Sequence, residues 1–387
     1  MSINICVSRE KEEYEKRVAV TPDTVKKLKE LGCIIHLETN AGHEAHYTDS
    51  MYEEAGAELH NSITEHLASA DCVLTVGQPP PDSLGTMKKG AMLIGMLNPY
   101  HQNPQSRDSL VGAASKQGIT CFAMELVPRI TRAQSMDVLS SQANLAGYKS
   151  ILDAAEHYTR AFPMMMTAAG TVAPAKVFVM GAGVAGLQAI ATAKRLGAVV
   201  SATDVRPAAK EQVQSLGGSF IAVENEEFKE AETAGGYAKE MSDDYKKQQV
   251  ELVESHIATQ DIVITTALIP GRPAPKLVTR QMIESMKPGS VLVDLAAPQG
   301  GNCELCEPGS VIDHKGVSIV GHMNVPSRLP TDASSLYAKN IWNFLQLILD
   351  KDTQGISIDW EDEIIKAMAL TNENEIIHPL FSKDKAA

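Results

Sequence analysis

Three glycines with phosphate-binding spacing follow the apolar, β-rich stretch Lys176-Val-Phe-Val-Met. Gly181, Gly183 and Gly186 form the pattern Gly-x-Gly-x-x-Gly before an expected helix that reaches about Leu196. The first glycine permits a tight turn, the second lets a pyrophosphate approach the backbone, and the third lets the helix pack on the strand. The helix N-terminus then presents N–H groups and a favourable dipole to two phosphates. The pattern predicts a dinucleotide-binding turn; the alternative is a turn that only packs.

An acidic residue suited to ribose recognition ends the next expected strand. Asp204 follows the glycines by about 20 residues, where dinucleotide-binding folds place a carboxylate on the ribose hydroxyls. A carboxylate repels a 2′-phosphate, so NAD (NADH) is favoured over NADP. Arg206 lies nearby and either tolerates such a phosphate or faces solvent.

A polar cluster follows an expected strand in the first half of the chain, and open α/β sheets bind ligands at such strand ends. Arg129, Asp137 and Ser140 offer the donors and the acceptor that a carboxamide needs. On a helix, Gln134, Asp137 and Ser141 would share one face. The alternative is a helix N-terminus with capping residues and a salt bridge.

Tyr237 lies beside Gly235 and Gly236 in a polar segment, residues 231–244, that has no clear period. A long loop at this place in a compact domain is typical of a functional element. We expect Tyr237 to belong to a lid that reaches a bound ligand.

Cys303 and Cys306 have the spacing of a metal or redox pair. Neither a second cysteine pair nor a histidine cluster accompanies them in the sequence, so we expect buried structural thiols and no metal. The six scattered cysteines indicate a reducing compartment.

The elements that would position these residues alternate between strand and helix along the whole chain. Such alternation predicts the α/β class, with two doubly wound Rossmann-like domains whose parallel sheets are covered by helices. Long helical runs, 134–162 and 332–350, are expected to link the domains. We therefore expect a discontinuous first domain, 1–133 plus 345–387, and an NAD(H)-binding domain over 134–344. The expected strands are Ile3–Val7, Ile34–Glu38, Cys72–Val76, Met92–Met96, Thr120–Met124, Lys176–Met180, Val199–Thr203, Ser219–Val223, Asp261–Thr266, Ser290–Leu295 and Ser318–Gly321.

Composition restricts the class of partner. A chain of 387 residues is long enough for two cores. Its net charge of -13 excludes a nucleic-acid partner, which would need clustered Lys and Arg. The most apolar region, Met164–Ala193, is interrupted by Pro174, Lys176 and glycines, so we expect a chain that is soluble alone.

Several motifs together resemble the NAD(H)-binding component, domain I, of proton-translocating NAD(P) transhydrogenase. The resemblance covers nearly the whole chain and is far more specific than the glycine turn alone. The stretches that carry it are Arg129–Ser141, Pro163–Pro174, Gly181–Gly197, Gly235–Lys239, Thr265–Pro275 and Gly300–Cys303.

The resemblance implies a homodimeric subunit that docks on a separate NADP(H)-binding component. Hydride would pass directly between NAD(H) and NADP(H), coupled to proton movement through membrane-spanning subunits. The chain would then lie on the cytoplasmic side, peripheral to the inner membrane through its partners. Membrane segments would be separate chains, because none follows His378-Pro379.

The same resemblance assigns roles to individual residues. Arg129, Asp137 and Ser140 would hold the nicotinamide, and Gln134 would reach the partner's nucleotide. Tyr237 would close over NAD(H). The cofactor-binding residues would be Gly181, Gly183, Val184, Ala185, Gly186, Asp204, Val205, Arg206, Tyr237, Ala267 and Leu268.

Two other functions are compatible with a dinucleotide-binding fold. Alanine dehydrogenases share the opening Glu15-Lys-Arg17-Val-Ala-Val-Thr-Pro22, but carry a substrate-binding Lys and a catalytic His at two later places. Here those places read Val76-Gly-Gln-Pro79 and Met96-Leu-Asn98-Pro99, with neither residue present. The second alternative is a non-catalytic NAD-binding module.

Overall fold

The computed structural model describes residues 2–101, 109–229, 241–269, 271–350 and 352–382. The chain forms two compact units, and each is described by itself. The first comprises Met1–Gln142 with Ser327–Ala387, and the second Ala143–Pro326.

The first unit is built on an eight-stranded sheet in the order β19-β18-β6-β5-β4-β1-β2-β3. Six strands are parallel, and β18 and β19 add an antiparallel edge next to β6. The parallel part places the carboxyl ends of β1, β4, β5 and β6 at one edge of the sheet. The strands are β1 (Asn4–Val7), β2 (Ile34–Glu38), β3 (Glu58–His60), β4 (Cys72–Leu74), β5 (Met92–Gly95), β6 (Thr120–Ala123), β18 (Ala369–Asn372) and β19 (Glu375–Ile376).

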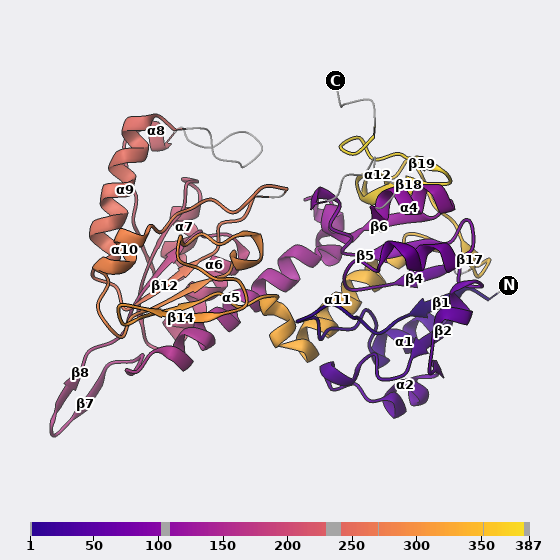
Figure 1. The fold of residues 1–387 in the computed structure, drawn as a ribbon, viewed down its shortest axis with the longest axis horizontal. Coiled ribbons are helices and arrows are strands. Elements are labelled where there is room, and N and C mark those ends of the chain that lie inside the picture. The colour runs from indigo at the N-terminus through magenta and orange to yellow at the C-terminus, as the bar shows by residue number, and fades with distance from the viewer. Residues whose placement is uncertain (1, 102–108, 230–240, 270, 351, 383–387) are drawn as a thin grey trace. The chain divides into compact units, whose positions relative to one another are not determined.

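Helices cover both faces of this sheet (Figure 1). One core contains side chains from α1 (Pro22–Glu30), α2 (Asp49–Ala55), α11 (Pro330–Leu345) and α12 (Glu363–Met368). The other contains α4 (Leu110–Gln117). The short α3 (Thr64–Leu67) precedes β4, and a two-stranded ribbon, β16 (Leu349–Asp350) with β17 (Gly355–Ile356), follows α11.

The unit boundaries differ from those expected. Residues 134 and 344 both lie inside the first unit, because α11 packs there along its length. Its Tyr337, Ile341 and Phe344 are almost fully buried in the first unit's core. The sequence therefore placed the start and end of the second domain too far outward.

The second unit has a seven-stranded sheet in the order β11-β10-β9-β12-β13-β15-β14, in which only β14 is antiparallel. The strand order reverses at β9, between β10 and β12, and open α/β sheets bind ligands at such a switch point. The strands are β9 (Lys176–Met180), β10 (Val199–Thr203), β11 (Ser219–Phe220), β12 (Ile262–Thr265), β13 (Val291–Asp294), β14 (Val311–His314) and β15 (Val317–Val320).

Helices α5 (Val138–His157), α6 (Val184–Arg195) and α7 (Ala209–Ser215) contribute to one core of this unit. Helices α9 (Asp243–Ile257) and α10 (Arg280–Ser285) contribute to the other, and the short α8 (Glu226–Lys229) precedes α9. The predicted fold class, two doubly wound Rossmann-like domains, is confirmed. Among the described residues, no helix combines the length and apolar character of a bilayer span.

A hairpin of β7 (Met165–Thr167) and β8 (Gly170–Val172) projects from the second unit's sheet (Figure 1). Its side chains are exposed except for the half-buried Val172. Met164 is 60% exposed and Met166 is 78% exposed. An apolar ribbon open to solvent on both faces is typical of a surface that another chain covers.

Candidate nucleotide-binding site

The glycine turn lies between β9 and α6, as the sequence predicted. Gly181 has a φ of 104°, and a Cβ there would lie 2.4 Å from Oγ1 of Thr266. A Cβ on Gly186 would lie 1.8 Å from the carbonyl oxygen of Gly181. Both positions therefore require glycine for packing, whether or not a ligand binds.

The middle glycine differs from the other two. A Cβ on Gly183 would meet no atom within 4 Å, so packing does not explain this residue. Gly183 is the N-cap of α6, and no side chain caps that helix. Open space in front of an uncapped, twelve-residue helix fits a pyrophosphate held by the N–H groups of Val184 and Ala185.

Helix α5 approaches this turn closely. A Cβ on Gly147 of α5 would lie 2.0 Å from the carbonyl oxygen of Ala185 on α6. Only glycine permits this approach, which fixes the first turn of α6 from the side opposite the open space.

Asp204 follows β10 and contacts the glycine turn. Its carboxylate accepts hydrogen bonds from the N–H of Ala182 at 2.7 Å and of Arg206 at 2.9 Å. The Arg206 guanidinium donates to both oxygens, with Nε–Oδ1 and Nη2–Oδ2 distances of 2.9 and 3.0 Å. Arg206 is thus paired with Asp204 instead of lying free in solvent. Val205, between them, is 62% exposed.

The segment after β12 is held by a residue that sequence reasoning did not select. Asn302, fully buried, accepts from the N–H of Ala267 at 3.0 Å and donates to its carbonyl oxygen at 2.8 Å. The same amide donates to the carbonyl oxygen of Pro275 at 2.8 Å. Asn302 thereby fixes the backbone that presents Leu268, which is 48% exposed. Its one local signal is the preceding Gly300-Gly301 turn, in which both φ angles are positive.

The Cys303–Cys306 pair lies beside this turn and forms no disulfide. Burial raises the pKa of Cys303 to about 11 and of Cys306 to about 12, so both are neutral thiols near pH 7. Cys303 packs in an apolar core, and its N–H donates to the Asp294 carboxylate at 2.8 Å. These contacts are structural.

The polar cluster expected at the nicotinamide lies in the first unit. Asp137 ends a 3₁₀ segment (Thr131–Met136) and precedes α5. Its carboxylate accepts from the N–H of Ser140 at 2.9 Å and from the Ser140 hydroxyl at 2.5 Å. Asp137 therefore caps α5, as the alternative interpretation required. The prediction that Gln134, Asp137 and Ser141 share one helical face was wrong, because the chain changes direction at Asp137.

Two arginines in this segment have different surroundings. Arg132 forms a bidentate ion pair with Asp362 at 2.7 and 2.9 Å. Arg129 is exposed and has no ion pair with any described residue, and Gln134 is exposed as well. The salt bridge thus uses Arg132, and Arg129 keeps its guanidinium available. Tyr237, the expected lid residue, lies outside the described residues.

Helix α11 fixes the corner between the 3₁₀ segment and α5. Asn340 donates to the carbonyl oxygen of Ser135 at 2.8 Å and accepts from Ser141 at 2.8 Å. Gln142 donates to the carbonyl oxygen of Ala333 at 3.1 Å.

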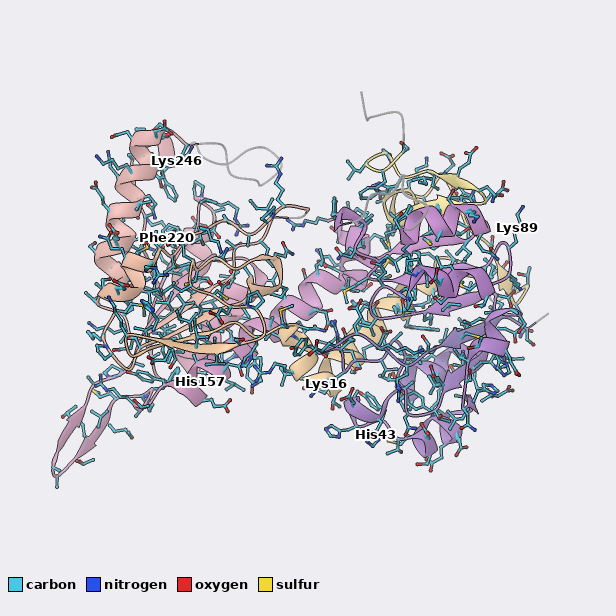
Figure 2. The ribbon with its side chains drawn as sticks, viewed as in Figure 1. Lys16, His43, Lys89, His157, Phe220 and Lys246 are labelled. Atoms are coloured by element: carbon cyan, nitrogen blue, oxygen red, sulfur yellow. The ribbon has the colours of Figure 1, made fainter. Side chains whose placement is uncertain are left out.

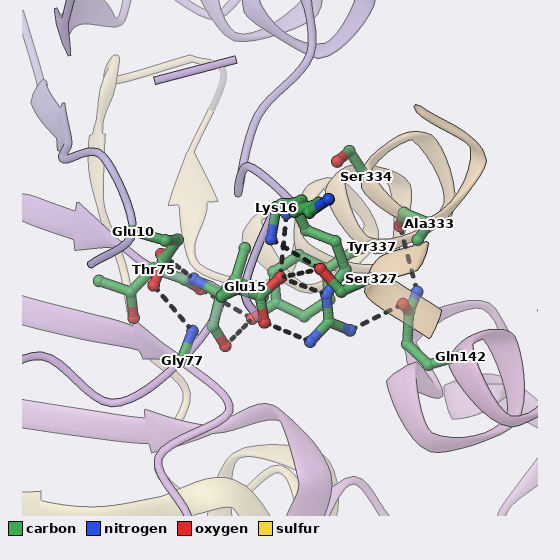
Figure 3. A network of polar contacts seen from close by, with 12 residues as sticks. Glu10, Glu15, Lys16, Thr75, Gly77, Gln142, Ser327, Ala333, Ser334 and Tyr337 are labelled. Atoms are coloured by element: carbon green, nitrogen blue, oxygen red, sulfur yellow. Dashed lines mark hydrogen bonds and ion pairs between the residues drawn. The ribbon is translucent and has the colours of Figure 1, made fainter. Parts of the chain in front are cut away.

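Gln142 also belongs to a buried polar network with Glu15 and Ser327 (Figure 3). Arg17 joins them: it donates to Gln142 at 2.8 Å and to both oxygens of Glu15 at 2.8 and 2.6 Å. A charge pair this well hydrogen-bonded fixes the first turns of α5 in one register.

Comparison with known families agrees with this architecture. Residues 6–146 match the family Alanine dehydrogenase/PNT, N-terminal domain, and residues 150–379 match Alanine dehydrogenase/PNT, C-terminal domain. The first of the alpha-subunit chains of NAD(P) transhydrogenase from Rhodospirillum rubrum is 52% identical over 385 residues, which cover 98% of this chain and 99% of that protein. The chain belongs to the transhydrogenase alpha-subunit family.

Other members of this transhydrogenase family are similar along their whole length. The corresponding alpha-subunit chain of Rickettsia prowazekii is 44% identical, with 97% of this chain and 96% of that protein covered. A crystal structure of transhydrogenase from Sinorhizobium meliloti has a TM-score of 0.86 and 52% identity, covering 97% of this chain and all of that one. An L-alanine dehydrogenase structure, 24% identical with a TM-score of 0.80, shares the fold.

At the carboxyl edge of the first sheet, this transhydrogenase-family chain has Gln78 after β4 and Asn98 after β5. The backbone of Asn98 has a φ of 49°, and its N–H donates to Glu125 at 2.5 Å. Burial raises the pKa of Glu125 to about 7 and is also the main reason why the pKa of Glu10 rises to about 7. The Glu10 carboxylate accepts from the N–H groups of Val76 and Gly77 at 2.6 and 3.3 Å. Both carboxyls thus bind the backbone of the sheet edge.

Proposed function

We propose that this chain binds NAD(H) on its second unit and passes hydride directly to or from NADP(H) on a partner component. The glycine turn carries the proposal: Gly183 leaves open space at an uncapped helix N-terminus, and packing does not account for it. The high identity to transhydrogenase alpha subunits over almost the whole chain supports the reaction class.

Asp204 would hold the adenosine ribose. Its position beside the turn fits that role, because its carboxylate binds the N–H of Ala182 within the glycine pattern. Both oxygens are paired with Arg206 here, so two ribose hydroxyls would displace part of this ion pair. The carboxylate favours NAD over NADP by repelling a 2′-phosphate.

Arg129, Gln134, Asp137 and Ser140 would act by position rather than by proton transfer. Hydride exchange between two nicotinamides moves no proton at the reacting carbons, so the protein must only orient the rings and exclude water. Asp137 and Ser140 are fixed by their cap hydrogen bonds, and Arg129 projects from the same segment.

An amino-acid dehydrogenase activity is disfavoured by the first sheet edge. Oxidation of an amine needs a group that takes the accompanying proton. Gln78 and Asn98 occupy the places where a Lys and a His would stand, and Glu10 and Glu125 accept hydrogen bonds from backbone N–H groups.

We further propose that the active form is a homodimer joined through the β7–β8 hairpin. The exposed methionines of this ribbon need an apolar partner, and a second copy supplies the same surface. Proton coupling and the peripheral position at the cytoplasmic face of the inner membrane would come from separate membrane subunits.

Reconstitution tests the function. The chain is mixed with the NADP(H)-binding component of a transhydrogenase, and reduction of an NAD analogue by NADPH is followed. We expect transfer only when both components are present and no NADH formation from alanine. Alanine-dependent NADH formation, or no transfer in the mixture, would contradict the proposal.

A further inference from the structure

Three histidines converge at the β3 edge of the first unit's sheet. His36 lies on β2, His60 on the edge strand β3, and His66 on α3. Strands β2 and β3 are parallel, with His36 opposite Glu58 and Glu38 opposite His60. Side chains two residues apart along a strand share a face, so His36, Glu58 and His60 lie on one side of the sheet.

The imidazoles are close enough to share one small ligand. The Nδ1 atom of His36 lies 3.1 Å from Nε2 of His60. The ring of His66 has its centre 3.7 Å from that of His60 and 4.6 Å from that of His36. One ring nitrogen from each histidine lies within 4.8 Å of the other two.

A fourth candidate ligand lies beside them. The Oε2 atom of Glu58 is 3.4 Å from Nδ1 of His36. This carboxylate side chain is 59% exposed, so it can move toward the three rings without leaving a buried environment.

Asn4 on β1 sets the tautomer of His36. Its Oδ1 lies 3.2 Å from Nε2 of His36, and because a carbonyl oxygen only accepts, Nε2 carries the hydrogen. The Nδ1 lone pair then points toward His60. Histidines that bind metals usually donate their other ring N–H to such an oxygen, which fixes the ring.

Hydrogen bonding within the protein accounts for only part of this cluster. The contact between His36 and His60 pairs two ring nitrogens. The ring nitrogens of His66 make no hydrogen bond with any residue in the part of the chain that the structure describes, although this side chain is half-buried. A stack of histidines alone leaves that nitrogen unexplained.

We propose that His36, His60 and His66 bind Zn²⁺, with Glu58 as the fourth ligand. Three imidazoles and one carboxylate form a donor set that suits zinc and is too rich in nitrogen for Mg²⁺ or Ca²⁺. Tetrahedral zinc holds its nitrogens at about 2.0–2.1 Å, a geometry that small rotations of the His60 and His66 rings supply.

The site would act on the structure of the first unit. It joins the three-residue edge strand β3 and the four-residue α3 to β2, and neither short element is long enough to be stable alone. Strands β1, β4 and β5 separate β2 from β6, which leads to Arg129. Zinc binding is therefore expected to stabilise this edge without altering hydride transfer.

Zinc titration of the chelator-treated chain tests the proposal, with calorimetry for affinity and thermal unfolding for stability. We expect one Zn²⁺ per chain and a melting temperature that rises with zinc concentration. His60→Gln and His66→Gln should each weaken binding at least ~10-fold, the loss typical when a metal site's supporting contacts are removed. The matched control is His43→Gln, because His43 is exposed and outside the cluster (Figure 2); its affinity should equal that of the wild type.

Co²⁺ substitution gives a second readout that needs no variant. The wild type should show the intense visible absorption of tetrahedral Co²⁺, and excess Zn²⁺ should abolish it. Absence of stoichiometric zinc binding, a weak octahedral cobalt spectrum, or unchanged affinity in both variants would overturn the proposal and leave a histidine stack only.

Discussion

The guanidinium of Arg206 donates to both carboxylate oxygens of Asp204, at 2.9 and 3.0 Å, while the N–H of Ala182 binds the same carboxylate. The residue expected to recognise the ribose is therefore fixed against the glycine turn before any nucleotide binds. An ion pair at this place holds the carboxylate in position and also competes with the ribose for it.

Replacing this carboxylate should weaken NADH binding. In Asp204→Asn the ribose hydroxyls lose a charged acceptor, and hydrogen bonds to charged groups contribute about 1.5–3 kcal/mol, so we expect at least ~10-fold weaker binding. Fluorescence titration with NADH measures this loss. Arg206→Gln is the companion variant: it leaves the carboxylate without its cation and should lower NADPH affinity more than NADH affinity. Equal NADH affinity in Asp204→Asn and wild type would remove Asp204 from the site.

The two neighbouring arginines provide a matched pair for the nicotinamide site. Arg129→Ala should slow hydride transfer in the reconstituted system by roughly 10- to 100-fold, because loss of a positioning contact misplaces the reacting ring. Arg132→Ala removes an arginine from the same segment but disrupts only a surface ion pair with Asp362, so its rate should stay within about twofold of wild type. Equal rates for the two variants would contradict the assignment.

The hairpin predicts how the chain associates. Met166→Asp places a charge on a side chain that is 78% exposed in the single chain and that we expect to be buried in the dimer. Burial of an unpaired charge is costly, so dimerisation should weaken at least ~10-fold. Met51→Asp is the control, since Met51 is 40% exposed on α2, away from the hairpin. Light scattering over a concentration series distinguishes monomer from dimer, and dimers of unchanged affinity in Met166→Asp would reject this interface.

The sheet edge predicts a pH dependence of stability. Burial raises the pKa of Glu125 from 4.5 to about 7, so its protonated form fits the folded state better. The stabilisation is complete below pH 4.5 and is lost as the pH rises through about 7. Glu125→Gln stays neutral and should gain stability relative to wild type over that range. Denaturant unfolding at several pH values measures the difference, and a constant difference across the range would disprove it.

Local sequence was sufficient for the features that depend on neighbouring residues. The β9–turn–α6 unit was predicted with its bounds nearly correct, because the strand, the three glycines and the helix are contiguous. Inner strands such as β2, β9 and β10 were predicted residue for residue, since a buried parallel strand is a short apolar run.

Features that depend on distant contacts were missed. Asn302 binds Ala267, 35 residues earlier, and its sequence surroundings resemble an ordinary glycine turn. The edge strands β3 and β14 carry mixed polar patterns, with both half-buried and exposed positions, so periodicity did not reveal them. The face shared by Gln134 and Ser141 was wrong because the cap at Asp137 begins a new helix there. The histidine cluster exists only because β2, β3 and α3 meet.

The most direct measurement follows a deuterium label from the transferring C4 position of NADH in the reconstituted system. If the two nicotinamides exchange hydride without an intermediate on the protein, NADPH should form with the full label and none should appear in water. Label lost to solvent, or solvent hydrogen found at C4 of NADPH, would contradict direct transfer and would require an acid or base of the protein in the reaction.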